Sequence, residues 1–291
     1  MRRVDGAPTG GMSGRTVLVT GATRGIGLET ARQLAAMGAR VVLGVRDPAR
    51  GAAVAMAIES RAGAAELLQL DLASFASVRA AADRFGVTHG RLDVLVNNAG
   101  IAVKTRARTA DRHERTWQTN FLSHVLLTRL LLPALRRGAR PRIVNVSSEG
   151  HRSGRIRWDD LELERPGAYG RFRAYANTKL AQVLFTRELA RREPGIAVNA
   201  LHPGAIATDI WGELSPFMRA IAGWIVKSPE QGAAPVTRLA SDPALDGGGG
   251  DAVTGRYFRR FRETAPSAAG SDDDAAARLW AYAAKEIGLS A

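Results

Sequence analysis

The chain has 291 residues, of which 45% are hydrophobic and 24% are charged, so it can bury the core of a globular domain. It contains no cysteine, which excludes disulfide bonds and thiolate metal ligands or nucleophiles and fits a reducing cytoplasm. The net charge is +13, but the arginines are spread along the chain without a recognised nucleic-acid-binding module, and no apolar run reaches the length of a membrane span. We therefore expect a cytoplasmic protein without a nucleic-acid or membrane partner.

The N-terminal residues carry two arginines but lack the apolar stretch of a signal peptide. We expect residues 1–14 to be a disordered leader, with Met12 as an alternative start. Residues 15–291 are expected to form a single domain, because neither a repeat nor a linker divides them. The glycine-rich residues 246–251 are expected to be a flexible loop.

Six short runs of aliphatic, mostly β-branched residues alternate with helical patterns. The runs are residues 16–20, 40–45, 66–72, 92–100, 141–148 and 195–204. Nearly continuous apolar strands separated by helices are typical of a parallel sheet that is buried on both faces. The pattern predicts an α/β fold with a doubly wound, mostly parallel sheet.

The first predicted strand runs into the sequence TGATRGIG, where Gly21, Gly25 and Gly27 precede a helical pattern. Glycines between a strand and a helix let the backbone approach a pyrophosphate, and the helix N-terminus supplies N–H groups and a positive dipole. The position after the first strand favours a dinucleotide site over the alternative, a purely structural turn.

Four further motifs follow in order: NNAG at residues 97–100, NVSS at 145–148, Tyr-x-x-x-Lys at 175–179 and HPG at 202–204. With the glycine motif, they resemble the short-chain dehydrogenase/reductase family from residue 15 to the end. The sequences TGRYF and ARLWAYAAKEIGL near the C-terminus resemble the retinol dehydrogenases and related carbonyl reductases. The resemblance implies a Rossmann fold with a small substrate lid. It also implies an oxidoreductase that transfers hydride between a nicotinamide cofactor and a carbonyl or alcohol.

The resemblance further implies a catalytic tetrad of Asn120, Ser148, Tyr175 and Lys179. Tyr175 would be the general acid or base and Ser148 would hold the substrate oxygen, on which negative charge develops. Lys179 and the positive nicotinamide ring would lower the pKa of the phenol, and Asn120 would anchor a water in a proton relay with Lys179. The alternatives are a surface pair for Tyr175 and Lys179 and a satisfied polar core residue for Asn120.

Cofactor choice depends on the end of the second predicted strand. An acidic residue there binds the ribose of NAD, whereas an arginine accommodates the 2′-phosphate of NADP. The acidic position of the family falls on Val45, Arg46 follows, Arg24 can approach the same phosphate, and Asp47 is displaced from the acidic position, so NADP(H) is favoured. The implied cofactor contacts are Gly21, Thr23, Arg24, Gly25, Ile26, Gly27, Arg46, Asp71, Leu72, Asn98, Ala99, Gly100, Tyr175, Lys179, Pro203, Gly204, Ile206 and Thr208.

We expect residues 149–175 and 206–230 to build the substrate pocket and lid. The apolar side chains in the second segment favour an apolar substrate or, equally, a helix packed on the core; they are Trp211, Phe217, Met218 and Trp224. The acidic residues of the first segment are expected to lie in a solvated loop; they are Asp159, Asp160, Glu162 and Glu164. No metal site is predicted, because His124, His151 and His202 lack the spacing of metal ligands and are read as surface or satisfied core residues.

The partners implied are a small carbonyl or alcohol substrate and a second copy of the chain. Long helices with broad apolar faces, starting near Arg112 and Tyr175, correspond to the pair that forms a four-helix interface in the family, which predicts a homodimer or homotetramer. Two other functions stay open. One is a catalytically weak, dinucleotide-sensing binding protein on the same fold, and the other is a basic nucleic-acid binder.

Overall fold

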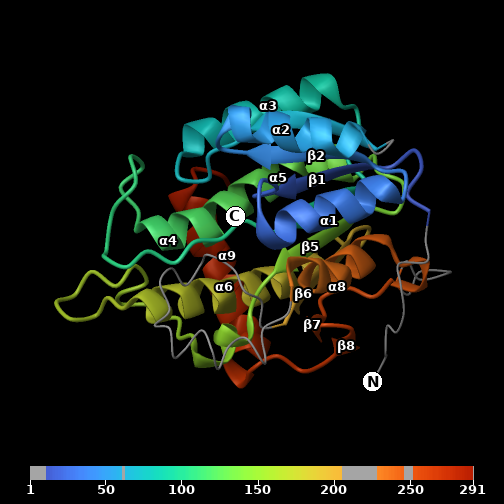
Figure 1. The fold of residues 1–291 in the computed structure, drawn as a ribbon. Helices are drawn as coiled ribbons and strands as arrows, with labels where there is room; N and C mark the ends of the chain where they lie inside the picture. Colours follow the sequence, from blue (N-terminus) through green and yellow to red (C-terminus); the bar gives the residue numbers. More distant parts are fainter. Residues whose placement is uncertain (1–10, 61–62, 205–227, 246–251, 291) are drawn as a thin grey trace.

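A parallel sheet forms the centre of the molecule in the computed structural model, which describes residues 11–60, 63–204, 228–245 and 252–290 (Figure 1). Its strand order is β3-β2-β1-β4-β5-β6-β7-β8, and all neighbours pair in parallel except β7 and β8. The strands are β1 (Thr16–Thr20), β2 (Arg40–Val45), β3 (Ala64–Gln69), β4 (Val94–Asn97), β5 (Arg142–Val146), β6 (Ala197–His202), β7 (Tyr257–Arg259) and β8 (Arg262–Glu263). The doubly wound α/β fold is confirmed.

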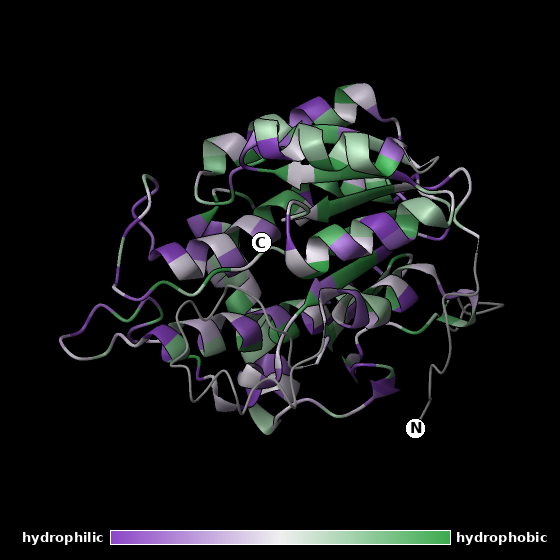
Figure 2. Cartoon of the chain, viewed as in Figure 1, coloured by the Kyte–Doolittle hydropathy of each residue, from purple (hydrophilic) through white to green (hydrophobic). Residues whose placement is uncertain are grey.

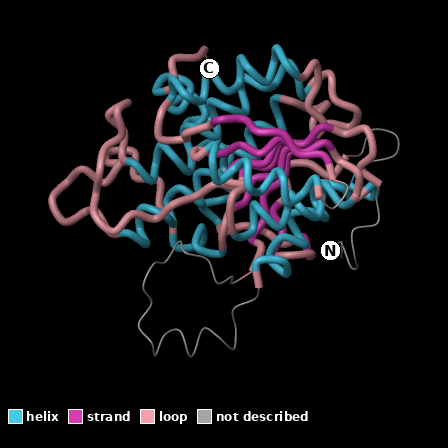
Figure 3. Tube along the Cα trace, turned by 45° about the horizontal axis from the view of Figure 1, so that its top comes forward, coloured by secondary structure: helices cyan, strands magenta, loops and turns pink. Residues whose placement is uncertain are grey.

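Helices cover both faces of the sheet, as the turned view of Figure 3 shows. The helices packed against one face are α1 (Gly25–Ala36), α2 (Pro48–Glu59) and α8 (Pro229–Ser241). Those of the other face are α3 (Phe75–Thr88), α5 (Ser123–Leu135), α6 (Arg171–Arg192) and α9 (Asp273–Glu286). Helix α4 (Arg115–Trp117) leads into α5, and short 3₁₀ turns lie at Glu149–Ser153, Pro243–Leu245 and Ala268–Ser271.

All six predicted strands are present, and the differences lie at their ends. The run 92–100, for example, forms a strand only over Val94–Asn97, because its last residues belong to the NNAG loop. Strands β7 and β8 were not predicted, since they have three and two residues and show no periodicity. The motif residues therefore follow the strands and lie in the loops at their carboxyl ends.

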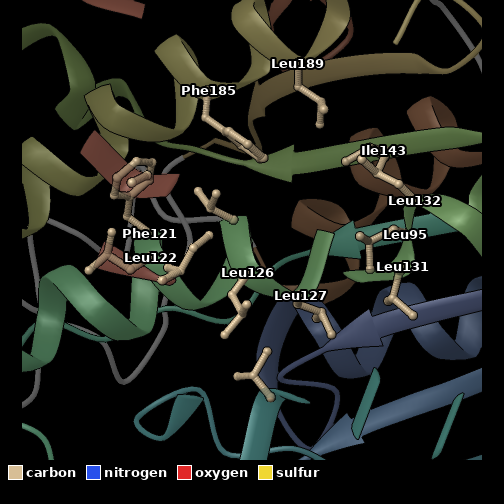
Figure 4. Packing of buried hydrophobic residues seen from close by; sticks show 14 of the residues in the cluster. Leu95, Phe121, Leu122, Leu126, Leu127, Leu131, Leu132, Ile143, Phe185 and Leu189 are labelled. Atoms are coloured by element: carbon tan, nitrogen blue, oxygen red, sulfur yellow. The ribbon is translucent and has the colours of Figure 1, made fainter. Parts of the chain in front are cut away.

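Alternate residues of each central strand enter different cores, as a sheet buried on both faces requires. Leu18 packs with the α3, α5 and α6 side, whereas Val17 and Val19 pack with the α1 and α8 side. Figure 4 shows the first core, where Leu126 and Phe185 lie among other buried aliphatic and aromatic side chains. Hydropathy follows the same pattern, with apolar strands inside and mixed helices outside (Figure 2).

Four buried polar side chains fasten α5 and α6 to the middle of the sheet. Asn97 of β4 and Asn145 of β5 are register partners, and Nδ2 of Asn97 donates to Oδ1 of Asn145 over 2.9 Å. Nδ2 of Asn97 also donates to Thr128 of α5, while Nδ2 of Asn145 donates to Thr186 of α6. This row of hydrogen bonds fixes the two helices that carry the proposed site residues.

Helix α9 lies on the outer side of α5 and α6. The Trp280 ring stacks on Phe185 with centroids 5.9 Å apart, and the guanidinium groups of Arg129 and Arg192 lie over the indole. A helix of the same chain therefore covers the outer face of α6, one of the two helices assigned to the four-helix interface. The homodimer or homotetramer stays a prediction, and an interface through this face of α6 would have to displace α9.

The packed domain includes residues before the expected boundary at residue 15. Met12 is buried, and its N–H donates to the carbonyl of Met37 after α1 over 2.8 Å. The domain therefore reaches at least to Met12, three residues before the expected boundary, while residues 1–10 lie outside the described residues. In the described part of the chain, no helix combines the length and the apolar character needed to cross a membrane.

Candidate active site

The motif residues meet at the carboxyl ends of the central parallel strands. Gly21 follows β1, Asn98 follows β4, Ser148 follows β5 and Pro203 follows β6. These strands are neighbours in the sheet, so their loops form one edge. The crevice outside the carboxyl ends of the strands is where ligands bind in open α/β sheets.

The glycine turn requires its glycines. Gly21 and Gly25 have φ values of 68° and 56°, a region that side chains disfavour. A Cβ on Gly27 would lie 2.4 Å from both the carbonyl oxygen of Gly21 and Nδ2 of Asn98. Within the described residues, no side chain caps the first turn of α1 and none of that turn is acidic. The N-terminal N–H groups of α1 are therefore suited to an anion.

Thr20 and His124 join the glycine turn to the helices. Thr20 Oγ1 accepts the N–H groups of Asn98 and Ala99, each over 3.0 Å, and lies 3.1 Å from His124 Nε2. His124 Nδ1 lies 2.9 Å from the carbonyl oxygen of Asn120, so Nδ1 carries the proton and Nε2 accepts from Thr20. Burial lowers the pKa of His124 to about 4, which keeps it neutral at pH 7. His124 is a core histidine with satisfied partners, as expected.

Asn120 lies in a π-helical turn, Gln118–Leu122, between α4 and α5. Its side chain exchanges two hydrogen bonds with the backbone of Ile101, since Nδ2 donates to the carbonyl over 2.9 Å and Oδ1 accepts the N–H over 2.8 Å. Nδ2 also donates to Thr178 Oγ1. An indifferent helix former is thus placed where its amide binds the NNAG loop and α6, and π turns often mark functional sites.

Tyr175 and Lys179 lie one turn apart on α6 and are both buried, with relative exposures of 6% and 3%. Lys179 Nζ is 5.4 Å from the centroid of the Tyr175 ring. The alternative of a solvated surface pair is therefore wrong.

The pKa values differ from the expectation. Burial raises the pKa of Tyr175, and a hydrogen bond with Ser148 only partly opposes it. Burial also lowers the pKa of Lys179 to about 7, so near neutral pH the lysine is only partly charged. The expected lowering of the phenol pKa by Lys179 does not arise from the residues of the chain alone, because both groups are removed from water and a partly neutral lysine exerts little field.

Gln182, which the sequence reasoning missed, lies between Lys179 and Asn120. Lys179 Nζ donates to the carbonyl of Val146 over 2.8 Å and to Gln182 Oε1 over 3.0 Å. Gln182 Nε2 donates in turn to the carbonyl oxygen of Asn120 over 2.9 Å. The structure thus shows a side-chain link between Lys179 and Asn120, and the relay water stays a prediction. Its position three residues after Lys179, on the same helical face, is the signal that was available.

The two serines of NVSS have different roles. Ser147 is buried and its Oγ donates to the carbonyl of Lys179 over 2.9 Å, which is a structural contact. Ser148 is half-buried and its Oγ accepts the N–H of Gly150. His151 bridges the Ser148 carbonyl and the N–H of Ser267, so it is a satisfied core residue. Ser148 is thereby held beside Tyr175.

Arg46 and Arg24 are both exposed at the ends of the neighbouring strands β2 and β1. Val45, at the family's acidic position, is buried. Asp47 caps α2, since its Oδ1 accepts the N–H groups of Ala49 and Arg50. Asp47 therefore already has a structural role, which weakens it as evidence for an unphosphorylated ribose.

The remaining cofactor contacts are only partly described. Asp71, after β3, accepts the N–H of Ala73, Leu72 is buried, and Gly204 has a φ of 111°. Ile206 and Thr208 lie outside the described residues, and so do all four apolar residues expected to line the lid: Trp211, Phe217, Met218 and Trp224.

The expectation of a solvated acidic loop is wrong for Glu162. Its Oε1 lies 2.6 Å from His113 Nδ1 and its Oε2 accepts the N–H of Glu114 over 2.7 Å. Burial opposes ionisation, but these hydrogen bonds lower the pKa of Glu162. Asp160 accepts the N–H of Glu164, whose carboxylate pairs with Arg106 and Arg108. This loop is fastened to the body at the start of the helices that carry Asn120.

Over the described residues, no group of three or more His, Asp or Glu side chains is arranged to hold a metal ion. The chemistry available at this edge comes from a phenol, a hydroxyl, an amine and backbone N–H groups.

Comparison with known proteins agrees with this geometry. A family model described as short chain dehydrogenase matches residues 15–160. The chain belongs to this family. It is 39% identical to retinol dehydrogenase 14 of Homo sapiens, with 98% of this chain and 89% of that protein aligned.

Solved structures give the same assignment. An uncharacterized protein from Mycobacterium paratuberculosis superimposes with a TM-score of 0.78 at 34% identity, covering 98% of this chain and 96% of that one. The RhlG/NADP active-site complex of Pseudomonas aeruginosa has a TM-score of 0.66 at 29% identity, covering 87% and 96%. The protein is thus an oxidoreductase of the short-chain dehydrogenase family that resembles the retinol dehydrogenases.

Proposed function

We propose that this short-chain dehydrogenase interconverts an apolar alcohol and its carbonyl compound with NADP(H), using Tyr175 as general acid or base. The observation that carries the proposal is the buried Tyr175 and Lys179 pair beside Ser148, at the same sheet edge as the glycine turn. A buried phenol and lysine beside a half-buried hydroxyl suit proton transfer to an oxygen atom.

The residues fit a dinucleotide. Gly27 lacks room for a Cβ, and the N-terminus of α1 bears no acidic residue or side-chain cap among the described residues, so the turn can take a pyrophosphate. Arg46 and Arg24 supply positive charge at the ribose end, which favours a 2′-phosphate. The NADP named in the Pseudomonas aeruginosa complex supports this choice. When bound, the cofactor supplies or accepts the hydride.

The chain's own residues handle the proton and the charge. In the reductive direction, the Tyr175 phenol donates its proton to the oxygen on which negative charge develops, and Ser148 donates a second hydrogen bond to that oxygen. Lys179, whose ammonium form has one N–H beyond those given to Val146 and Gln182, would hold the nicotinamide ribose and would stabilise the phenolate that is left. In the oxidative direction each proton moves the opposite way.

The name of the human relative, a retinol dehydrogenase, supports an apolar primary alcohol as the substrate class. We place the reaction in the cytoplasm, as the cysteine-free composition favours. The partner is the small alcohol or carbonyl substrate.

The test is a panel of alcohol and carbonyl pairs assayed with both cofactors. We expect the retinol and retinal pair and long-chain aldehydes to turn over faster than a polar hydroxy acid, and NADPH to give a higher kcat/KM than NADH. Arg46→Asp should abolish or reverse the cofactor preference, whereas Arg50→Asp on the exposed surface of α2 should not. Equal kcat/KM with both cofactors would contradict the proposal for NADP(H).

The same panel also distinguishes the proposed enzyme from a dinucleotide-sensing binding protein on the same fold. Tight binding of NADPH without turnover of any pair would favour a binding protein. Turnover of one pair by the wild-type protein rules that alternative out.

A further inference from the structure

The Gln182 side chain is the connection between Lys179 and the Asn120 carbonyl, and its orientation is determined. The ammonium form of Lys179 only donates, so the amide atom 3.0 Å from Nζ is Oε1. The carbonyl of Asn120 only accepts, so the amide atom 2.9 Å from it is Nε2. Gln182 is 2% exposed, so this arrangement is held within the core.

The Asn120 carbonyl oxygen accepts two side-chain hydrogen bonds, one from His124 Nδ1 and one from Gln182 Nε2. Both hydrogens of the Asn120 side-chain amide are also used, by Ile101 and Thr178. Asn120 is therefore a fixed point to which Gln182 can tie the amine of Lys179.

We infer that Gln182 is a positioning residue that holds Lys179 beneath the Tyr175 phenol by tying the amine to the π-helical turn of Asn120. The inference rests on the proposed function and deepens it. The Gln182 amide accepts from Lys179 at Oε1 and donates to the Asn120 carbonyl at Nε2, so it fixes the position of the amine and sets the polarity around it.

Because the groups around Lys179 are uncharged, the residue at position 182 has a large influence on the Lys179 pKa. The titratable groups that face the amine are Tyr175 on the same helix and His124 on α5, and both are neutral at pH 7. Its hydrogen-bond partners, the Val146 carbonyl and Gln182 Oε1, are neutral acceptors. Within the described residues no carboxylate contributes to its pKa. A charge introduced at residue 182 would therefore act on an otherwise uncompensated amine.

The experiment measures the Lys179 pKa directly by NMR of protein labelled with 13Cε-lysine, on the full chain without cofactor. The chain contains four lysines, Lys104, Lys179, Lys227 and Lys285, so four resonances are expected. Lys179→Arg removes one of them and assigns it. The variants compared are Gln182→Glu, Gln182→Met, Gln182→Asn and the control Gln69→Glu, whose residue is exposed on β3.

Gln182→Glu should raise the Lys179 pKa by about 1 to 3 units, because an opposite charge favours the ammonium form. Gln182→Met should lower the pKa, because the charged form loses an acceptor. Gln182→Asn, which is one methylene shorter and cannot span both partners, should fall between wild type and Met. Gln69→Glu should leave the value unchanged. If Gln182→Met does not fold, the Glu and Asn variants carry the test.

A Lys179 pKa that is the same in wild type and in every Gln182 variant overturns the inference, even if the enzyme is active. The Lys179 pKa could change with the residue at position 182 while the protein turns over none of the alcohol and carbonyl pairs. That result supports the Gln182 bridge and contradicts the proposed function. The two failures are therefore distinguishable.

Discussion

The Tyr175 phenol lies at the centre of the proposed chemistry, and the rest of its ring is packed against the core. We expect Tyr175→Phe to keep the fold and the affinity for NADPH, because only the oxygen is removed. Turnover should fall by about 10² to 10⁴, the range for loss of a general acid. Turnover and the NADPH dissociation constant of both proteins check this, with Tyr282→Phe on α9, outside the expected substrate pocket, as a matched control. A fully active Tyr175→Phe enzyme would end the proposed role.

The lowered pKa of Lys179 predicts that the stability difference between wild type and Lys179→Met depends on pH. Its folded pKa is lowered to about 7, while an unfolded lysine titrates near 10.4. Between these values the unfolded state binds the proton and the folded state does not, so wild-type stability rises with pH. Lys179→Met has no such contribution, so its stability relative to wild type should fall by about 2 kcal/mol between pH 7 and pH 9.

Urea unfolding at the two pH values measures this difference. Lys285→Met, at the exposed end of α9, is the control and should show little dependence on pH. The same relative stability for Lys179→Met at pH 7 and pH 9 would show that Lys179 keeps an ordinary pKa.

At this scale the sequence predicted which residues meet but not how each is held. The motifs brought Asn120, Ser148, Tyr175 and Lys179 to one edge, and the structure places them there. Gln182 was missed because a glutamine on a helix has no distinctive pattern. Glu162 was assigned to solvent because the partner that buries it, His113, is 49 residues away in the sequence.

Among the elements, the row of hydrogen bonds through Asn97 and Asn145 decides where α5 and α6 lie. We expect Asn145→Ala to reduce the free energy of unfolding by about 1 to 3 kcal/mol, because it leaves buried partners unsatisfied. Asn97→Ala should have a similar effect. The double variant should lose less than the sum of the two, because the bond between the two amides can be lost only once.

Urea unfolding of the four proteins provides this cycle. Additive effects of Asn97→Ala and Asn145→Ala would show that the two side chains contribute independently. The free energy of unfolding of Gln69→Ala, at an exposed position of the edge strand β3, is expected to stay within about 0.5 kcal/mol of wild type, as is usual for surface positions.

The element pattern was largely predictable because buried parallel strands are apolar without interruption. The exceptions have physical causes. Strands β7 and β8 are too short to show a period, and the π-helical turn at Gln118–Leu122 keeps the apolar spacing of a helix while adding one residue to its turn. The turn is stabilised by Asn120 binding a distant loop, which no local propensity records.

For the whole molecule, the position of α9 bears on assembly. Because α9 covers the outer face of α6 and the Arg129 side chain of α5 lies over its Trp280, a four-helix interface between two chains cannot form through this face of α6 without displacing α9. The outer edge of β7 is likewise paired, with β8. We expect a monomer of 31.0 kDa by light scattering at micromolar concentration. A stable dimer would show that another surface carries the contact.

The late position of α9 in the sequence also affects how the protein folds during its synthesis. The Arg79 and Arg129 side chains, on α3 and α5, donate to the carbonyls of Ile287 and Ser290 at the very end of the chain. During synthesis, α5 and α6 leave the ribosome about 80 to 150 residues before α9, and until the last segment docks their apolar face stays open to water. While the segment between α6 and α9 is synthesised, the nascent chain therefore exposes an apolar surface that is closed only when α9 docks.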